Sequence, residues 1–376
     1  MTDNSQGSSV LAEVLGAHRA LLGSADVPRA VSQALSQVGG SAGVDRAYIF
    51  QITGTDNDEW FASQRYEWAS ESVAPQIDNP QLQNLRLRAA GYSRWLDSFL
   101  QFRPIHGNID ELPAHERPAL EEQGIVSILI VPIFADSKLW GFVGFDDCHT
   151  RRVWIEAEVD LLVSLTISLG YALSGSRTAL DSATTASLAM VGRLLDVHSA
   201  TFSDTPMDHL MQRTEARVRI LIEAHRYLIA RGSPENISMG NLLRSLTPHL
   251  DAVSSCRMDG FSGRVQVSAG EIALPVDRAL DAVIVLADVL AVIACNASTG
   301  CQDLTEARLG ISLHSAEGKA ELTVTAMGKD GTPVEGLPPL DGMAHVLLRR
   351  VQEQMRATVI RTTVAGLLFR LQFPVA

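Results

Sequence analysis

Residues 125–133 read IVSILIVPI and residues 139–146 read LWGFVGFD. Both stretches are rich in β-branched and aromatic side chains, which favour strands over helices. Only the short turn at residues 135–138, ADSK, separates them. The spacing therefore predicts a β-hairpin.

The segments on either side extend this pattern into an α/β arrangement. Residues 46–52 (RAYIFQI) predict another strand, and residues 156–173 carry apolar side chains at helical spacing. Residues 10–38 predict a helical region interrupted at Pro28.

The strand patterns at residues 45–50, 125–134 and 140–148 are like those of GAF domains and occur in the same order. In this chain they are followed by Arg152-Val153-Trp154. The segment 10–173 therefore resembles a GAF sensor domain. The resemblance implies an antiparallel sheet with flanking helices, which binds a small molecule over the sheet or dimerises.

Aromatic side chains gather between the first strand and the hairpin. They either line a ligand cleft or form the core on that face of the sheet. The candidate lining residues are Tyr48, Phe50, Trp60, Tyr66, Trp68, Trp95 and Phe99, with Phe102 next to them.

The pair Cys148-His149 follows the hairpin, and Cys-His pairs attach chromophores in some GAF proteins. We expect a strand-end loop here, with a bilin or haem sensor as an alternative. Asp146 and Asp147 are predicted to cap the turn rather than to bind a metal ion. No cofactor is expected.

Residues 174–231 predict a helical hairpin, with helices near 178–199 and 206–231. Asp204 or Thr205 can cap the second helix, and Pro206 suits its first turn. Two antiparallel helices expose their apolar stripes unless something covers them, so we expect a homodimer that closes a four-helix bundle.

The hairpin resembles that of histidine kinases with the phosphoacceptor motif H-H-R-V-K-N-N, through residues 188–197 and 217–228. The resemblance places the acceptor histidine at Asp181 or Ser182, and neither side chain has an imidazole. An active phosphotransfer protein would have to use His198 or His225 instead, and this remains an alternative.

Residues 232–376 predict a second α/β region. Strands are expected at 264–268, 308–314, 319–327, 358–363 and 367–373, and helices at 239–250, 275–294 and 340–356.

This region resembles the ATP-binding α/β sandwich of histidine kinases, through Leu274-Pro275-Val276-Asp277-Arg278-Ala279 and the helix at residues 286–294. That helix normally reads L-N-E-L-V-x-N-A. Here Ala287 and Val292 replace the two asparagines, the second of which binds Mg²⁺, and Asp288 replaces the glutamate.

The adenine-binding motif D-x-G-x-G is altered in the same way. Ala326 stands at its aspartate and Asp330 at its second glycine, while Gly328 is kept. With these substitutions, the resemblance implies a degenerate kinase domain with no ATP or metal site. The alternative is that the alignment of the helix is shifted by one turn, which would make Asn296 the Mg²⁺ ligand.

Composition limits the remaining functions. A net charge of −12 without a basic cluster disfavours nucleic acid and anionic membranes as partners. The polar start and the carboxylates Asp281 and Asp288 in the longest apolar stretch predict a cytoplasmic protein. We expect domains at 10–173, 174–231 and 232–376, forming a non-catalytic scaffold or regulator whose partner is a response regulator or a kinase.

Overall fold

The computed structural model separates into two compact units, Met1–Thr184 and Thr185–Ala376. The residues that the structure describes are 3–136, 138–174, 207–231, 235–254, 265–297, 308–316, 318–328, 332–333, 348–349, 352–353, 355–360 and 367–375. The predictions for Asp181, Ser182, His198 and the helix at 178–199 lie outside these residues.

A six-stranded antiparallel sheet with the order β3-β2-β1-β6-β5-β4 forms the centre of the N-terminal unit. Its strands are β1 (Arg46–Asp56), β2 (Glu59–Ala69), β3 (Leu85–Arg86), β4 (Ile105–Asn108), β5 (Ser127–Ala135) and β6 (Lys138–Asp147). The three predicted strands and the β5–β6 hairpin are confirmed. Strands β2, β3 and β4 were not predicted from the sequence.

Strand β5 lies between β4 and β6 and is buried over nearly its whole length, which explains its almost unbroken apolar sequence. Strand β4 pairs only with residues 127–130. Pro132 lies beyond that pairing, so its missing N–H leaves no acceptor on β4 unsatisfied.

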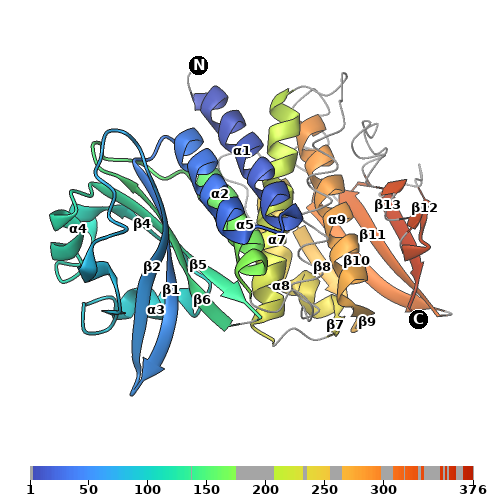
Figure 1. Ribbon diagram of the computed structural model, residues 1–376. Helices are drawn as coiled ribbons and strands as arrows, with labels where there is room; N and C mark the ends of the chain where they lie inside the picture. Colours follow the sequence, from blue (N-terminus) through green and yellow to red (C-terminus); the bar gives the residue numbers. More distant parts are fainter. Residues whose placement is uncertain are drawn as a thin grey trace. The chain divides into compact units, whose positions relative to one another are not determined.

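Three helices pack on one face of this sheet: α1 (Asp3–Gly23), α2 (Val27–Ala42) and α5 (Glu156–Leu173) (Figure 1). The predicted interruption at Pro28 is the start of α2. Asp26 accepts a hydrogen bond from the Arg29 backbone N–H, and the proline occupies the first turn, where its missing N–H has no helical partner.

Short helices and turns carry the chain across the opposite face. They are η1 (Pro80–Leu82), α3 (Ser93–Phe99), η2 (Ile109–Glu111) and α4 (Pro118–Glu122). Side chains from α3 and α4 join an apolar cluster with Tyr48, Phe50 and Phe142 of the central strands. This face of the sheet carries the candidate site.

The C-terminal unit holds a five-stranded mixed sheet with the order β12-β13-β11-β10-β8, in which only β8 and β10 are parallel. Its strands are β8 (Val265–Ala269), β10 (Arg308–Ala316), β11 (Lys319–Met327), β12 (Thr358–Ile360) and β13 (Leu367–Pro374), with a separate pair β7 (Asn236–Ser238) and β9 (Ala273–Pro275). The predicted strands are confirmed within the described residues. Most of the helix predicted at 340–356 lies outside them.

Three helices of this unit contact one another: α7 (Met207–Ile229), α8 (Met239–Ser254) and α9 (Val276–Ala297). Every residue of α9 from 279 to 293 is buried, as its nearly continuous apolar sequence requires.

The expectation of a homodimer depended on uncovered apolar stripes on both hairpin helices, and the structure describes part of the second of them. Leu221, Ala224 and Leu228 of α7 are fully buried, and α7 packs on α8 and α9 in the same unit. This part of the stripe is thus covered without a second copy, and the homodimer remains a prediction.

Candidate functional site

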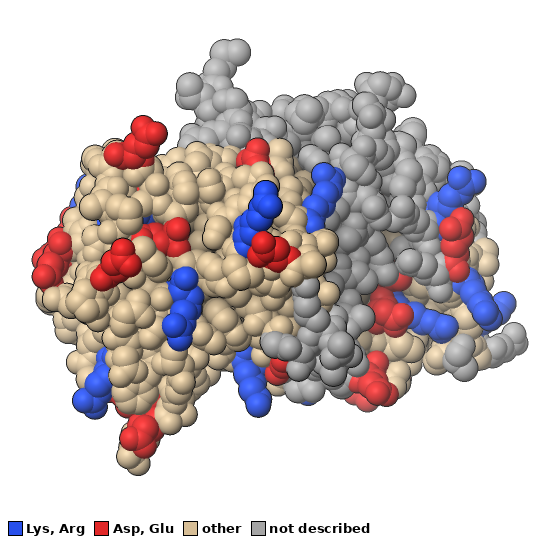
Figure 2. All heavy atoms as spheres, in the orientation of Figure 1, with Lys and Arg blue, Asp and Glu red and all other residues tan. Residues whose placement is uncertain are grey.

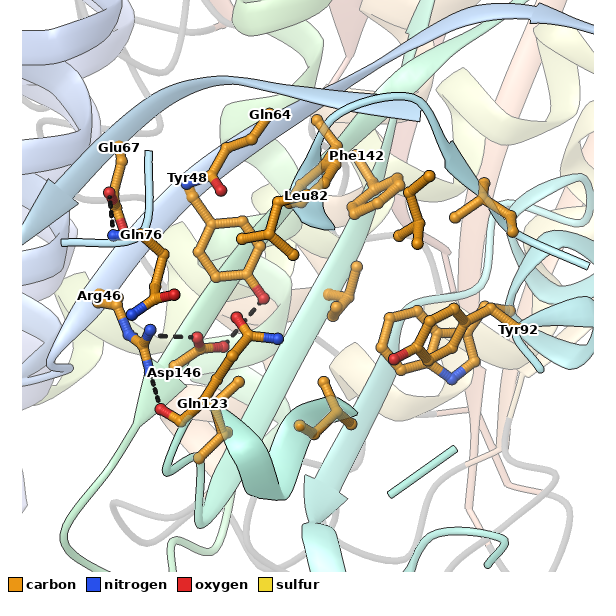
Figure 3. Close-up of a pocket in the computed structure, with 17 residues that line it drawn as sticks. Arg46, Tyr48, Gln64, Glu67, Gln76, Leu82, Tyr92, Gln123, Phe142 and Asp146 are labelled. Atoms are coloured by element: carbon orange, nitrogen blue, oxygen red, sulfur yellow. Dashed lines mark hydrogen bonds and ion pairs between the residues drawn. The ribbon is translucent and has the colours of Figure 1, made fainter. Parts of the chain in front are cut away.

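A cavity of about 40 Å³ lies on the face of the N-terminal sheet opposite α2. Its polar lining residues are Arg46, Gln64, Glu67, Gln76, Gln123 and Asp146, and its apolar wall includes Phe50, Leu82, Leu85, Leu87, Trp95 and Phe142 (Figure 3). At about 10–15 Å³ for each water, the enclosed space holds roughly three water molecules.

The pairing of β1 with β6 builds the floor of this cavity. Arg46 lies opposite Asp146, Tyr48 opposite Gly144, and Phe50 opposite Phe142. Because side chains two residues apart on a strand share a face, all three pairs belong to the same side of the sheet. The rings of Phe50 and Phe142 stack with centroids 5.0 Å apart.

Gly144 allows the Tyr48 ring to lie flat across β6. A Cβ atom at this position would come within 2.3 Å of the ring. In this position the Tyr48 hydroxyl donates a hydrogen bond of 3.0 Å to Asp146 Oδ1.

Asp146 is completely buried, and burial raises the pKa of its carboxyl from 3.8 to about 7, although Arg46 acts in the opposite direction. Arg46 Nε lies 3.7 Å from Asp146 Oδ2, which is too long for a hydrogen bond. The guanidinium donates instead through Nη2, to the backbone oxygen of Gln123 at 2.7 Å and to Cys148 Sγ at 3.1 Å.

A β-bulge brings two further polar side chains to the cavity. Ile49 pairs with Tyr66 but Phe50 pairs with Gln64, so β2 carries one extra residue at this point. Gln64 and Glu67 are three residues apart and would face opposite sides of a regular strand. The bulge puts both on the cavity side.

The predicted aromatic set divides between two sides of the sheet. Tyr48, Phe50 and Trp95 line the cavity. Phe99 is buried behind it, with its ring 5.4 Å from that of Phe142, and Trp60 is partly buried against the same cluster.

The other predicted aromatics do not line the cavity. Trp68 packs against α2, where a Cβ atom on Gly39 would come within 2.5 Å of its ring. Tyr66 is paired with Ile49 and is also absent from the lining. Phe102 stacks on Phe134 with centroids 3.9 Å apart.

Sequence reasoning missed Arg46, Gln64 and Asp146 as site residues. A faint signal existed, because Arg46 and Asp146 are opposite charges at the ends of two apolar strand patterns. Asp146 was instead predicted to cap the turn, and this prediction was wrong. Its carboxylate is buried and accepts a hydrogen bond from the Tyr48 hydroxyl. Asp147 does cap the turn, accepting hydrogen bonds from His149 N and Thr150 N.

Cys148 and His149 form the predicted strand-end loop, tied to Asp45. Asp45 Oδ2 accepts from Cys148 N at 2.7 Å and lies 2.9 Å from His149 Nδ1. Burial raises the pKa of the Cys148 thiol, which reduces the thiolate needed for covalent attachment. The cavity volume is also well below the several hundred Å³ that a bilin or haem requires.

The positions compared with kinase chemistry lie in the interior of the C-terminal unit. Ala287, Asp288 and Val292 on α9 are all buried, and so is Ala326 on β11. The carboxylate of Asp288 forms a hydrogen-bonded ion pair with Arg217 Nη2 of α7. His225, also on α7, is half-buried, and the side chain of Asn296 lies outside the described residues.

The described residues contain no group of three or more His, Cys, Asp or Glu side chains arranged to hold a metal ion. On the face drawn in Figure 2, the described lysines, arginines, aspartates and glutamates are interspersed, with no large patch of one sign. None of the described helices combines the length and apolar character needed to cross a bilayer.

Comparison with known proteins identifies the N-terminal fold. The GAF domain family matches residues 26–173. The methanogenesis regulatory histidine kinase FilI of Methanothrix harundinacea (strain 6Ac) is 42% identical over 172 residues, which cover 46% of this chain and 19% of that relative. The alignment thus spans about a fifth of the kinase.

Two solved structures illustrate the structural likeness. The far-red absorbing dark state of JSC1_58120g3 with bound biliverdin IXa is 22% identical and covers 45% of this chain and 99% of its own, with a TM-score of 0.37. The photoproduct state of GAF3 from Slr1393 of Synechocystis sp. PCC6803 is 20% identical, covers 40% and 94%, and has a TM-score of 0.33. From the family match, residues 26–173 of this chain are a GAF domain.

Proposed function

We propose that this chain is a non-catalytic regulator in two-component signalling. Its GAF domain takes a small molecule as input, and its C-terminal unit docks a response regulator or a partner kinase. The relationship of part of the chain to a protein named as a histidine kinase supports this setting. The proposed protein acts as a homodimer through the helices predicted in residues 174–231.

The observation that carries the non-catalytic assignment is the environment of Asp288. Phosphoryl transfer requires Mg²⁺ to bridge and neutralise the phosphates, and the ligands must face the nucleotide. In this chain the only carboxylate among the three aligned positions on α9 pairs with Arg217, and the surrounding helix is buried at every position from 279 to 293.

The neighbouring substitutions support the same conclusion. Val292 offers no oxygen for a metal ion, and Ala326 offers no acceptor for an adenine amino group. An unpaired buried donor costs about 1–3 kcal/mol, so ATP would lose affinity as well as reactivity.

Incubation of the full chain with γ-labelled ATP and Mg²⁺ tests the proposal. We expect no label on the protein, both alone and with added response regulators. An acid-labile label would contradict it. Loss of that label in His198→Ala or His225→Ala would establish an active phosphotransfer protein instead.

A further inference from the structure

The cavity of the GAF domain leaves three buried polar groups without a hydrogen bond from the protein. Arg46 Nε, Gln64 Oε1 and Asp146 Oδ2 have no such partner, and their side chains are 2%, 3% and 0% exposed. Leaving one group of this kind unsatisfied is unfavourable, because the group has lost its hydrogen bonds to water and gained none in return. Three of them around one cavity indicate that something else supplies the missing bonds.

The positions of these groups define a polar and an apolar part. Arg46 and Asp146 lie together beside Gln123, whereas Gln64 points toward Tyr48 and Leu82 (Figure 3). The stacked rings of Phe50 and Phe142, with Leu82 and Leu87, form the apolar wall. A ligand that fits both parts has a hydrogen-bonding head and a short hydrocarbon body.

The charges of the lining favour an uncharged head. Arg46 and Asp146 compensate each other, and the carboxylate of Glu67 is already bonded by the backbone N–H groups of Gln76 and Ile77 at 2.7–2.9 Å. An anion would meet two carboxylates, and a cation would meet the arginine. Burying a charge without its own partner is strongly unfavourable, because the charge loses its hydration.

The gap between Arg46 Nε and Asp146 Oδ2, 3.7 Å, suits a single group that accepts from one atom and donates to the other. A hydroxyl or a primary carboxamide has both capacities.

We infer, building on the proposed sensor function, that this cavity binds a small uncharged molecule with a carboxamide or hydroxyl head between Arg46 and Asp146 and an apolar body of a few carbons. Its second hydrogen bond goes to Gln64. A cavity of about 40 Å³ holds roughly three to four water-sized groups, so the buried part of the ligand is small.

Three matched probes test this inference on the full chain at pH 8: propionamide, propionate and propylammonium. The first two have nearly the same shape and differ in charge. Ligand-detected NMR titration measures binding, together with the intrinsic tryptophan fluorescence, to which Trp95 in the cavity wall contributes. We expect propionamide to bind in the millimolar range, at least tenfold more tightly than either charged probe.

Variants locate the binding. Gln64→Met removes the amide at similar volume and should weaken propionamide binding at least fivefold. Gln33→Met makes the same change at an exposed position on α2 and should leave binding unchanged.

Tighter binding of propionate or propylammonium would overturn the assignment of an uncharged ligand. Absence of binding by all three probes up to about 100 mM would overturn the inference as a whole. Either result leaves the non-catalytic assignment to be decided by the labelling experiment, which does not depend on the cavity.

Discussion

Each unit of this chain buries an arginine–aspartate pair, and the two pairs differ in how closely their charged groups approach each other. Arg217 and Asp288 touch directly in a closely packed helical interface. Arg46 and Asp146 stand 3.7 Å apart beside a cavity, and one polar atom on each has no hydrogen bond.

The difference separates a structural pair from a binding site. A buried pair in direct contact compensates its two charges within the protein. In the more distant pair, Arg46 Nε and Asp146 Oδ2 form no hydrogen bond within the protein, and the residues line a cavity. The positions aligned with kinase motifs thus lie around the directly bonded pair, and the cavity lies beside the more distant pair in the GAF domain.

The largest expected effect comes from breaking the pair of Arg217 and Asp288. Asp288→Ala leaves the buried Arg217 guanidinium without this carboxylate, which should lower the free energy of unfolding by about 3 kcal/mol or more. Urea denaturation of the full chain measures the loss. The double variant Arg217→Met, Asp288→Leu removes both charges and should recover most of it. Equal stability of Asp288→Ala and the wild type would show that the pair is not structural.

A smaller effect is expected when the floor of the cavity is crowded. Gly144→Ala places a methyl group within 2.3 Å of the Tyr48 ring and should cost about 1–3 kcal/mol while weakening propionamide binding. Gly16→Ala is the matched control, since its Cβ meets nothing within 4 Å on helix α1. A neutral Gly144→Ala would mean that the ring of Tyr48 can move aside.

Asp146, paired with Arg46, should also make the stability of the protein depend on pH. The pKa of Asp146 is about 7 when folded and near 3.8 when unfolded, so the folded state holds the extra proton between these values. Its contribution to stability is therefore lost as pH rises from about 4 to about 7. From pH 5 to pH 8, the Tm of the wild type should fall by several degrees relative to that of Asp146→Asn. Parallel curves for the two proteins would refute this.

The smallest effect is expected at His18, with the opposite sign. Burial lowers the pKa of His18 to about 4, and its Nδ1 lies 2.7 Å from Ser168 Oγ between α1 and α5. Below about pH 6.5 the unfolded state takes up a proton that the folded state resists, so stability falls with acidification. His18→Gln should flatten the Tm curve between pH 7 and pH 5. A steeper curve in the variant would contradict this assignment.

Much of the fold could be predicted from the sequence, because residues 125–133 and 139–146 carry strand-forming side chains around a short turn. The helix at 156–173 followed from its spacing in the same way. The cavity could not be predicted. Arg46 and Asp146 meet because β1 pairs with β6 across a hundred residues, and no local pattern specifies that register.

Two other features depend on tertiary structure. The bulge that places Gln64 beside Glu67 arises in the β1–β2 pairing and leaves no pattern in the residues themselves. The amphipathic α7 was predicted to need a second copy, but apolar spacing alone does not say which surface covers a stripe. In the structure, α8 and α9 cover the part described.

Isothermal titration of the full chain with ATP, with and without Mg²⁺, measures whether the C-terminal unit can hold a nucleotide. We expect no binding tighter than the millimolar range in either condition, because the carboxylate of Asp288 is bonded to Arg217 and α9 is buried around it. Micromolar binding that requires Mg²⁺ would contradict this expectation, since such binding needs metal and nucleotide contacts that Val292 and Ala326 cannot make.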